Sequence, residues 1–354
     1  MQALSITAGK QARRLIEKQG LTPELIQCVA AASGSAKWLV LAGLDRYIFG
    51  EWLQDASHPI ALFGSSIGAW RMAVAAKEDP KAGFNAFIED YVNYKYIPGM
   101  TAAEITEESY RVLGKFLNQK DREAIVNNSA RPLHIIAARG KGLCGVQNKA
   151  AVSLGFFSAF LANMVSRKSL RYSFERFIFY SGNECRATKH FEDDGFPTQA
   201  VALTSDNLHD AVMASGAIPF VLDPIFKIDG AKNGPYYDGG ILDYHFDVAW
   251  QLKEGIVLFP HFYGDITPGW FDKVIKRKAK PSRLDNVLLL SPSEQFVAAL
   301  PGGKIPQRQN FKDMDEETRI NFWRHTVAES ERLADEFKEL LENQNKLMDC
   351  MKTV

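Results

Sequence analysis

One short stretch constrains the fold of this chain more than any other. Residues 60–63 form an apolar run typical of a buried strand, and residues 69–77 are typical of a helix. Between them, residues 64–68 read G-S-S-I-G, a G-x-S-x-G pattern. A chain that passes from strand to helix through so few residues must turn sharply. The pattern therefore predicts that Ser66 lies on a tight turn with its hydroxyl exposed.

The same turn is suited to the stabilisation of negative charge. Gly64 and Gly68 lack side chains that would collide with neighbouring backbone, so the turn can be tight. A helix N-terminus presents free N–H groups and the positive end of the helix dipole. Ile67, directly after Ser66, would supply one of these N–H groups. The stretch is a candidate site for a serine nucleophile beside a developing oxyanion.

Apolar runs alternate with helical segments along most of the chain. Because strands that are separated by helices form mainly parallel sheets covered on both faces, we expect a three-layer α/β/α fold with a mainly parallel central sheet. With 354 residues, 46% of them hydrophobic, one domain over residues 1–354 with its core at about 24–300 is expected. The predicted strands lie at residues 26–31, 60–63, 133–138, 177–180, 200–203, 225–228, 236–237, 255–259 and 287–290.

Three further segments have helical patterns. Residues 6–19 predict a surface helix, and residues 313–348 predict one charged amphipathic helix docked on the core. Residues 150–165 are apolar but shorter than the roughly 18 residues that a membrane span needs. They predict a buried helix packed on the sheet.

Charge and cysteine content restrict the partners. The 42 basic and 42 acidic residues cancel, which gives no general attraction to nucleic acid, so charged recognition must be local. The N-terminal stretch lacks the apolar core of a secretion signal. Scattered cysteines without zinc-like spacing predict free thiols in a reducing compartment and no metal site. We expect a cytoplasmic protein that needs no cofactor or metal; its cysteines are Cys28, Cys144, Cys185 and Cys350.

A serine hydroxyl needs a neighbouring group to take its proton, and histidine is the usual one. Of seven histidines, His261, which follows a predicted strand, and His245 are the candidates. One hypothesis is therefore a histidine-dependent esterase or thioesterase of the α/β-hydrolase type, with Ser66 paired to His261 or His245.

The other candidate base is Asp238. It ends a short predicted strand and precedes Gly239 and Gly240. Two glycines let the backbone turn tightly and let a carboxylate approach its neighbours. An unperturbed carboxylate, with a pKa of about 4, is a weak base, so burial would have to raise the pKa of Asp238.

Three motifs fall into order along the chain: the small-residue loop S-G-S-A-K at 33–37, the G-x-S-x-G turn, and D-G-G at 238–240. The stretch M-A-S-G-A-I-P at 213–219 precedes the aspartate. This ordered set, over about residues 26–290, resembles the patatin-like phospholipases. In that family the serine and the aspartate form a dyad without histidine, and a glycine-rich loop holds the oxyanion.

The resemblance implies that Ser66 is the nucleophile and Asp238 the general base. Gly34, Ser35 and Ala36 would form the oxyanion loop, and Lys37 would take the place of the family's arginine or lysine. The implied function is a lipid acyl hydrolase that cleaves lipid esters through an acyl-enzyme.

Two departures from the family pattern stand out. Residues 33–38 read S-G-S-A-K-W, with one glycine where the family usually has G-G-G-x-[RK]-G, and the segment after Asp238 lacks the family's asparagine and proline. A catalytically silent lipid-binding scaffold is therefore a further hypothesis.

Residues 268–280 combine aromatic and basic residues in the pattern of an amphipathic helix. Such a segment can lie on an anionic bilayer, where each basic residue contributes about 1 kcal/mol. A peripheral membrane contact, with residues 155–161 beside it, is one interpretation, and a solvated surface helix is the other.

Overall fold

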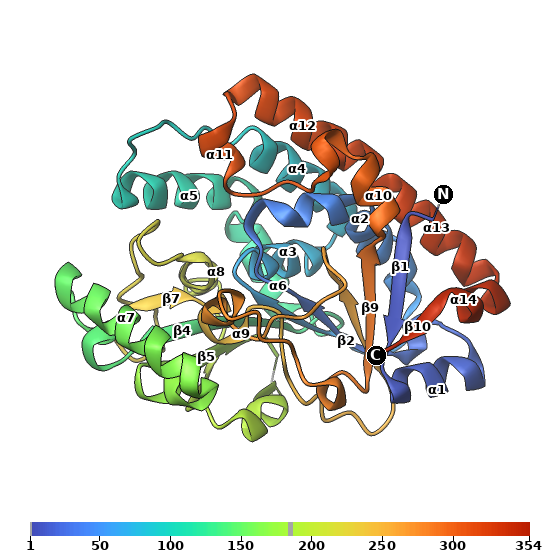
Figure 1. Cartoon of the computed structure of the whole chain (residues 1–354), viewed down its shortest axis with the longest axis horizontal. Coiled ribbons are helices and arrows are strands. Elements are labelled where there is room, and N and C mark those ends of the chain that lie inside the picture. The colour runs from blue at the N-terminus through green and yellow to red at the C-terminus, as the bar shows by residue number, and fades with distance from the viewer. Residues whose placement is uncertain (1, 183–186) are drawn as a thin grey trace.

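The computed structural model describes residues 2–182 and 187–354, and one ten-stranded sheet runs through this part of the chain (Figure 1). Nine strands follow the order β10-β1-β9-β8-β2-β3-β4-β5-β6, and β7 pairs with β4. Their bounds are β1 Leu4–Ala8, β2 Ile26–Ala31, β3 Ala61–Ser65, β4 Leu133–Gly140, β5 Phe174–Tyr180, β6 Thr198–Ala202, β7 Tyr236–Asp238, β8 Ile256–Pro260, β9 Val287–Pro292 and β10 Met351–Thr353.

The sheet is mainly parallel. The central strands β9, β8, β2, β3 and β4 run parallel to their neighbours in that order. Antiparallel pairs occur where β9 meets β1 and where β4 meets β5 and β7. All residues of β8 and β9 are buried, as expected for strands covered on both faces. The predicted α/β class with a mainly parallel sheet is confirmed.

Helices flank the sheet and complete the three layers (Figure 1). The α-helices are α1 Lys10–Gln19, α2 Ala42–Gly50, α3 Ile67–Ala75, α4 Pro80–Val92, α5 Ala102–Phe116, α6 Gln119–Asn127, α7 Lys149–Val165, α8 Leu208–Gly216, α9 Gly240–Asp243, α10 Glu294–Ala299, α11 Asn310–Asp313, α12 Glu316–Glu329, α13 Glu331–Glu342 and α14 Gln344–Cys350. Short 3₁₀ turns join several of them, at Ser35–Leu41, Trp270–Lys273 and elsewhere.

Helix α3, which follows Ser66, is buried between the sheet and neighbouring helices. All of its residues are buried, and it packs against β2, β3 and β4 with α4 and α8 beside it. Its one charged residue, Arg71, donates two hydrogen bonds to Asp45 of α2, at 2.8 and 2.7 Å. A buried charge needs such a partner, because an isolated one is expensive to remove from water. Ser66 therefore precedes a helix that is fixed on all sides.

The ends of the chain differ from the prediction. The predicted helix over 6–19 begins only at Lys10, because residues 4–8 alternate between buried and half-buried and pair with β9 and β10. The predicted single helix over 313–348 is wrong: α12, α13 and α14 are separate. The break at Ser330 has a physical cause, since its Oγ donates to the carbonyl of Val327 and accepts the N–H of Gly43 in α2.

Helix α7 also differs from the prediction of a buried helix. One face packs on the end of the sheet through Val152, Phe156 and Ala159. The opposite face is exposed and apolar. Neither α7 nor any other helix in the described ranges is long and apolar enough to span a membrane. This face consists of Leu154, Phe157, Leu161, Met164 and Val165.

Residues 268–280 do not form the predicted amphipathic helix. A 3₁₀ turn at Trp270–Lys273 is followed by irregular chain. Phe271 is buried, and Arg277 is held by the buried carboxylate of Asp272 and by Asn163 of α7. Asp272 also accepts hydrogen bonds from Asn163 and Arg167, which lie more than 100 positions away in the sequence. These distant contacts fix the segment in an irregular conformation instead of a helix with one basic face.

Candidate active site

Ser66 lies on the predicted turn. Strand β3 ends at Ser65 and α3 begins at Ile67, and Ser66 between them has φ 56° and ψ −128°. A positive φ is rare for a residue with a side chain and costs about 1–3 kcal/mol. A strained serine between strand and helix is the geometry of a nucleophile elbow.

The two glycines of the turn are required by space. A Cβ on Gly68 would lie 1.9 Å from the carbonyl oxygen of Ala31, and one on Gly64 would lie 2.5 Å from the Cα of Ala69. Both obstacles are backbone atoms that cannot swing away. The supporting role that the sequence predicts for Gly64 and Gly68 therefore has a steric basis, which is the close packing of β2, β3 and α3.

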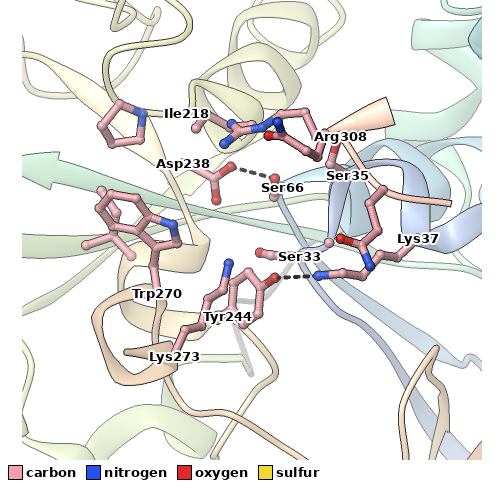
Figure 2. A pocket seen from close by; sticks show the side chains of 15 residues that line it. Ser33, Ser35, Lys37, Ser66, Ile218, Asp238, Tyr244, Trp270, Lys273 and Arg308 are labelled. Atoms are coloured by element: carbon pink, nitrogen blue, oxygen red, sulfur yellow. Dashed lines mark hydrogen bonds between the residues drawn. The ribbon is translucent and has the colours of Figure 1, made fainter. Parts of the chain in front are cut away.

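Asp238 reaches Ser66 through the pairing of β4 with two strands. Ser65 in β3 pairs with Ile136 in β4, and the next residue of β4, Ala137, pairs with Asp238 in β7. The short strand β7 thus continues along β4 beyond the end of β3. The Ser66 hydroxyl donates a hydrogen bond of 2.5 Å to Oδ2 of Asp238 (Figure 2). The predicted pair is brought together over 172 positions of sequence.

The environment of Asp238 raises its basicity. The carboxyl is buried, and this desolvation raises its pKa from 3.8 to about 6. The hydrogen bond from Ser66 and the Gly240 N–H, which donates to Oδ1 at 2.7 Å, oppose part of the rise. The required increase in pKa is therefore present, and Asp238 is still ionised at neutral pH.

The glycines after Asp238 have distinct roles. A Cβ on Gly239 would lie 2.2 Å from the carbonyl oxygen of Ile136, and one on Gly240 would lie 2.5 Å from Oγ of Ser33. Both positions therefore exclude side chains, as the D-G-G motif predicts. Gly240 also begins α9, which turns the chain away from the site.

Ser215 at the end of α8 positions the elbow. Its hydroxyl accepts the backbone N–H of Ser66 at 2.9 Å and donates to the carbonyl of Ile136 at 2.6 Å. It thereby ties the turn to β4, the strand that also carries Asp238 through β7. Sequence reasoning singled out residues 213–219 but assigned Ser215 no role, because its partners lie far away in the sequence.

The predicted oxyanion residues divide into three groups. Gly34 and Ser35 line the cavity that holds Ser66 and Asp238, Ile67 lines a second cavity that also reaches Ser66, and Ala36 is fully buried and lines neither. Ser35 has φ 51°, a strained value like that of Ser66.

The histidines do not take the place of a base. His245 and His261 are buried together, with ring centroids 4.3 Å apart. Their Nδ1 atoms accept backbone N–H groups of Thr267 and Tyr263, and burial lowers the pKa of both. No histidine of the described residues lines either cavity beside Ser66. The geometry supports the aspartate over the histidine hypothesis.

Two cavities meet at Ser66. One, of about 200 Å³, holds Asp238 and is polar (Figure 2). The other, of about 350 Å³, lies between α4, α5 and residues 216–222 and is mainly apolar and aromatic. Five residues line both cavities: Ser35, Ser66, Ile218, Arg308 and Gln309.

Several lining residues could not be found from local sequence. Tyr244, Lys273 and Arg308 reach the polar cavity from three separate segments, and Trp270 joins them. Only Trp270 and Lys273 belong to a stretch with a recognisable pattern, and that pattern predicts a membrane contact or a solvated surface helix rather than a place in the site. Arg308 had no local signal at all.

Lys37 points into the polar cavity. Its Nζ donates to the hydroxyl of Tyr244 at 3.4 Å and lies 5.3 Å from the ring centroids of Phe262 and Tyr263. Burial, and then the charges of Lys273 and Arg308, lower the pKa of Lys37 to about 8. The lysine is therefore part of the site and not a solvated charge.

Comparisons with known proteins do not identify a family for this chain. No protein-family model matches the chain, and no curated protein matches it.

Proposed function

We propose that the chain is a serine acyl hydrolase of the patatin-like phospholipase type, which cleaves lipid esters through an acyl-enzyme on Ser66. The observation that carries the proposal is the 2.5 Å hydrogen bond from the Ser66 hydroxyl to the buried carboxylate of Asp238 on a strained elbow. A nucleophile within hydrogen-bond reach of a base of matched pKa is the basic requirement of acyl transfer.

The steps follow from the geometry. The Ser66 oxygen attacks the ester carbonyl carbon while its proton passes to Asp238, and the tetrahedral oxyanion forms beside Gly34 and the N-terminus of α3. The bond between carbon and the alcohol oxygen then breaks, and the departing oxygen takes the proton from Asp238. Water attacks the acyl-enzyme, gives a proton to Asp238, and releases the carboxylic acid. The Ser66 oxygen recovers the proton.

The apolar cavity supports the proposal that the substrate carries a hydrocarbon acyl chain. It begins at Ser66 and Ile67 and is lined by aromatic and aliphatic side chains such as Trp70, Tyr91 and Ile105. Burial of a hydrocarbon chain contributes about 0.8 kcal/mol for each methylene. An ester whose carbonyl lies at Ser66 would place its acyl chain here and its alcohol in the polar cavity.

The exposed face of α7 supports a peripheral membrane contact. Leu154 and Phe157 are each 58% exposed, and Val165 is 90% exposed. Phe156 on the same helix contacts Phe220, which lines the apolar cavity. Through its buried face α7 therefore packs beside the proposed acyl site, while its opposite face is exposed and apolar. Docking of a cytoplasmic protein on a membrane through that exposed face would bring the site close to its lipid source.

A fluorophosphonate probe tests the catalytic proposal. Wild type is expected to be labelled, Ser66→Ala to lose all labelling, and Asp238→Asn to react about 10²–10⁴-fold more slowly. His261→Asn, checked for folding by circular dichroism, is the matched control and should retain labelling. A folded wild type that neither reacts nor turns over esters would instead support the lipid-binding scaffold.

Vesicle flotation tests the membrane proposal separately. Leu154→Ser combined with Phe157→Ser should reduce binding to phosphatidylglycerol-containing vesicles, whereas Val354→Ser, an exposed apolar residue at the far end of the chain, should not. Equal flotation of all three proteins would argue against α7 as the contact.

A further inference from the structure

Three cationic side chains gather at the polar cavity beside Ser66. Lys37 comes from the 3₁₀ turn Ser35–Leu41, Lys273 ends the turn Trp270–Lys273, and Arg308 precedes α11. Figure 2 shows them around the Ser66–Asp238 pair, with Arg308 on one side and the two lysines on the other. Lys37 is half-buried, and the other two are at the exposed rim.

None of the three makes a salt bridge with a carboxylate of residues 2–182 or 187–354, within 4.0 Å. Nearby cations of the same segment are paired, Arg277 with Asp272 and Lys278 with Asp265. The carboxylate that lines the cavity is Asp238, whose oxygens already accept hydrogen bonds from Ser66 and Gly240.

The three cations repel one another, and a bound anion would relieve this repulsion. Burial and the charge of Arg308 lower the pKa of Lys273, and both of these cations contribute to the lowered pKa of Lys37. Like charges in close proximity disfavour one another's charged forms. A bound anion of two charges would reverse that effect and would form charge-assisted hydrogen bonds with each cation.

The position of the cluster relates it to the leaving group. Ser66 lines both cavities; Lys37 and Lys273 line only the polar one, and Arg308 lines both. If the acyl chain fills the apolar cavity, the alcohol half of the ester must extend towards the cations. A cavity of about 200 Å³ has room for a small polar group there.

We propose that Lys37, Lys273 and Arg308 form a subsite for a phosphate monoester on the alcohol half of the substrate, so that the preferred substrates are acyl esters of a phosphorylated alcohol. A phosphate monoester carries about −1.5 to −2 charges at pH 7 and offers three strong acceptor oxygens, which suits three cations better than a carboxylate or a zwitterionic head group. The inference rests on the proposed acyl-hydrolase function of Ser66.

A matched substrate pair tests the subsite. The probes are 1-decanoyl-glycerol 3-phosphate and 1-decanoylglycerol, both used below their critical micelle concentrations, and the readout is the ratio of their kcat/KM values. Wild type should favour the phosphate ester, and Lys273→Gln and Arg308→Gln should each lower the ratio about tenfold. Arg308→Lys should restore part of it. Lys304→Gln, an exposed lysine of the same segment that lines neither cavity, is the control and should leave the ratio as in wild type.

Ionic strength provides a second readout. The cations at the rim are screened by salt, so raising the ionic strength from about 0.01 to about 1 M should lower the wild-type ratio and change the ratio of Arg308→Gln less. A ratio near one in wild type, or one that Lys273→Gln and Arg308→Gln leave unchanged, overturns the subsite without affecting the proposed hydrolase.

Calorimetry on Ser66→Ala separates the two proposals because it needs no turnover. Decanoyl-glycerol phosphate should bind more tightly than inorganic phosphate, and Lys273→Gln in the same background should weaken both. Equal binding of the two probes overturns the proposal, since the cluster would then hold a free phosphate ion only. Charge-dependent binding together with no ester turnover in wild type would retain the anion subsite and refute the hydrolase.

Discussion

Replacing Asp238 by asparagine is expected to stabilise the folded protein at neutral pH while it removes the base. Burial raises the pKa of Asp238 from 3.8 to about 6, so the folded protein holds this proton more tightly than the unfolded chain does. As pH rises from about 4 to about 7, the folded state therefore loses stability relative to the unfolded state. At 1.36 kcal/mol for each pKa unit, the loss amounts to about 3 kcal/mol.

Asparagine cannot ionise, so it avoids this loss. The assay is urea unfolding of wild type and Asp238→Asn at several pH values between about 4 and about 7.5. Other groups titrate alike in both proteins and cancel in the difference. The free energy of unfolding of the variant minus that of wild type should rise by about 3 kcal/mol across this range and then level off.

The hydrogen bond from Ser66 supplies an internal check. It opposes the rise in the pKa of Asp238, so Ser66→Ala should move the pH dependence to higher values. In the Ser66→Ala background, Asp238→Asn should therefore give a larger increase. A difference that stays constant within about 1 kcal/mol from pH 4 to pH 7.5 would refute the assignment of a buried, titrating carboxylate.

The remaining predictions concern the support of the site. Gly68→Ala should lower the free energy of unfolding in urea by about 3 kcal/mol or more, because its Cβ would lie 1.9 Å from a carbonyl oxygen of β2. Gly114→Ala on the open face of α5 is the control and should raise the free energy of unfolding by up to about 1 kcal/mol. Arg71→Met should cost about 3–5 kcal/mol because it leaves Asp45 buried without its partner, and adding Asp45→Asn should recover part of this loss. Ser215→Ala should lower stability by about 1–3 kcal/mol and reduce kcat, since the N–H of the elbow loses its acceptor; unchanged kinetics would contradict that positioning role.

Much of the fold follows from local pattern. Strands covered on both faces must be apolar along their whole length, so β2, β4, β8 and β9 could be found within a few residues. The edge strand β10 and its neighbour β1 could not, because alternate residues of β1 are only half-buried and β10 has only three residues. The exposed side of α7 was missed for a similar reason, since an apolar sequence does not tell which face a neighbour covers.

The sequence by itself determined the parts of the candidate site that are required by local geometry. A sharp turn with a serine needs Gly64 and Gly68, and the close approach of a carboxylate needs the glycines after Asp238. These local requirements are visible as short motifs of consecutive residues. The order of the motifs along the chain is visible in the sequence as well.

Only the tertiary structure decided which distant residues meet. β4 pairs with β3 and, one position further on, with β7, and this register places Asp238 against Ser66. The same long-range packing gathers Lys273 and Arg308 near Lys37 and seals the histidines away from the nucleophile. Such contacts depend on strand register and on how loops pass over the sheet edge, and neither leaves a periodic signal in the sequence.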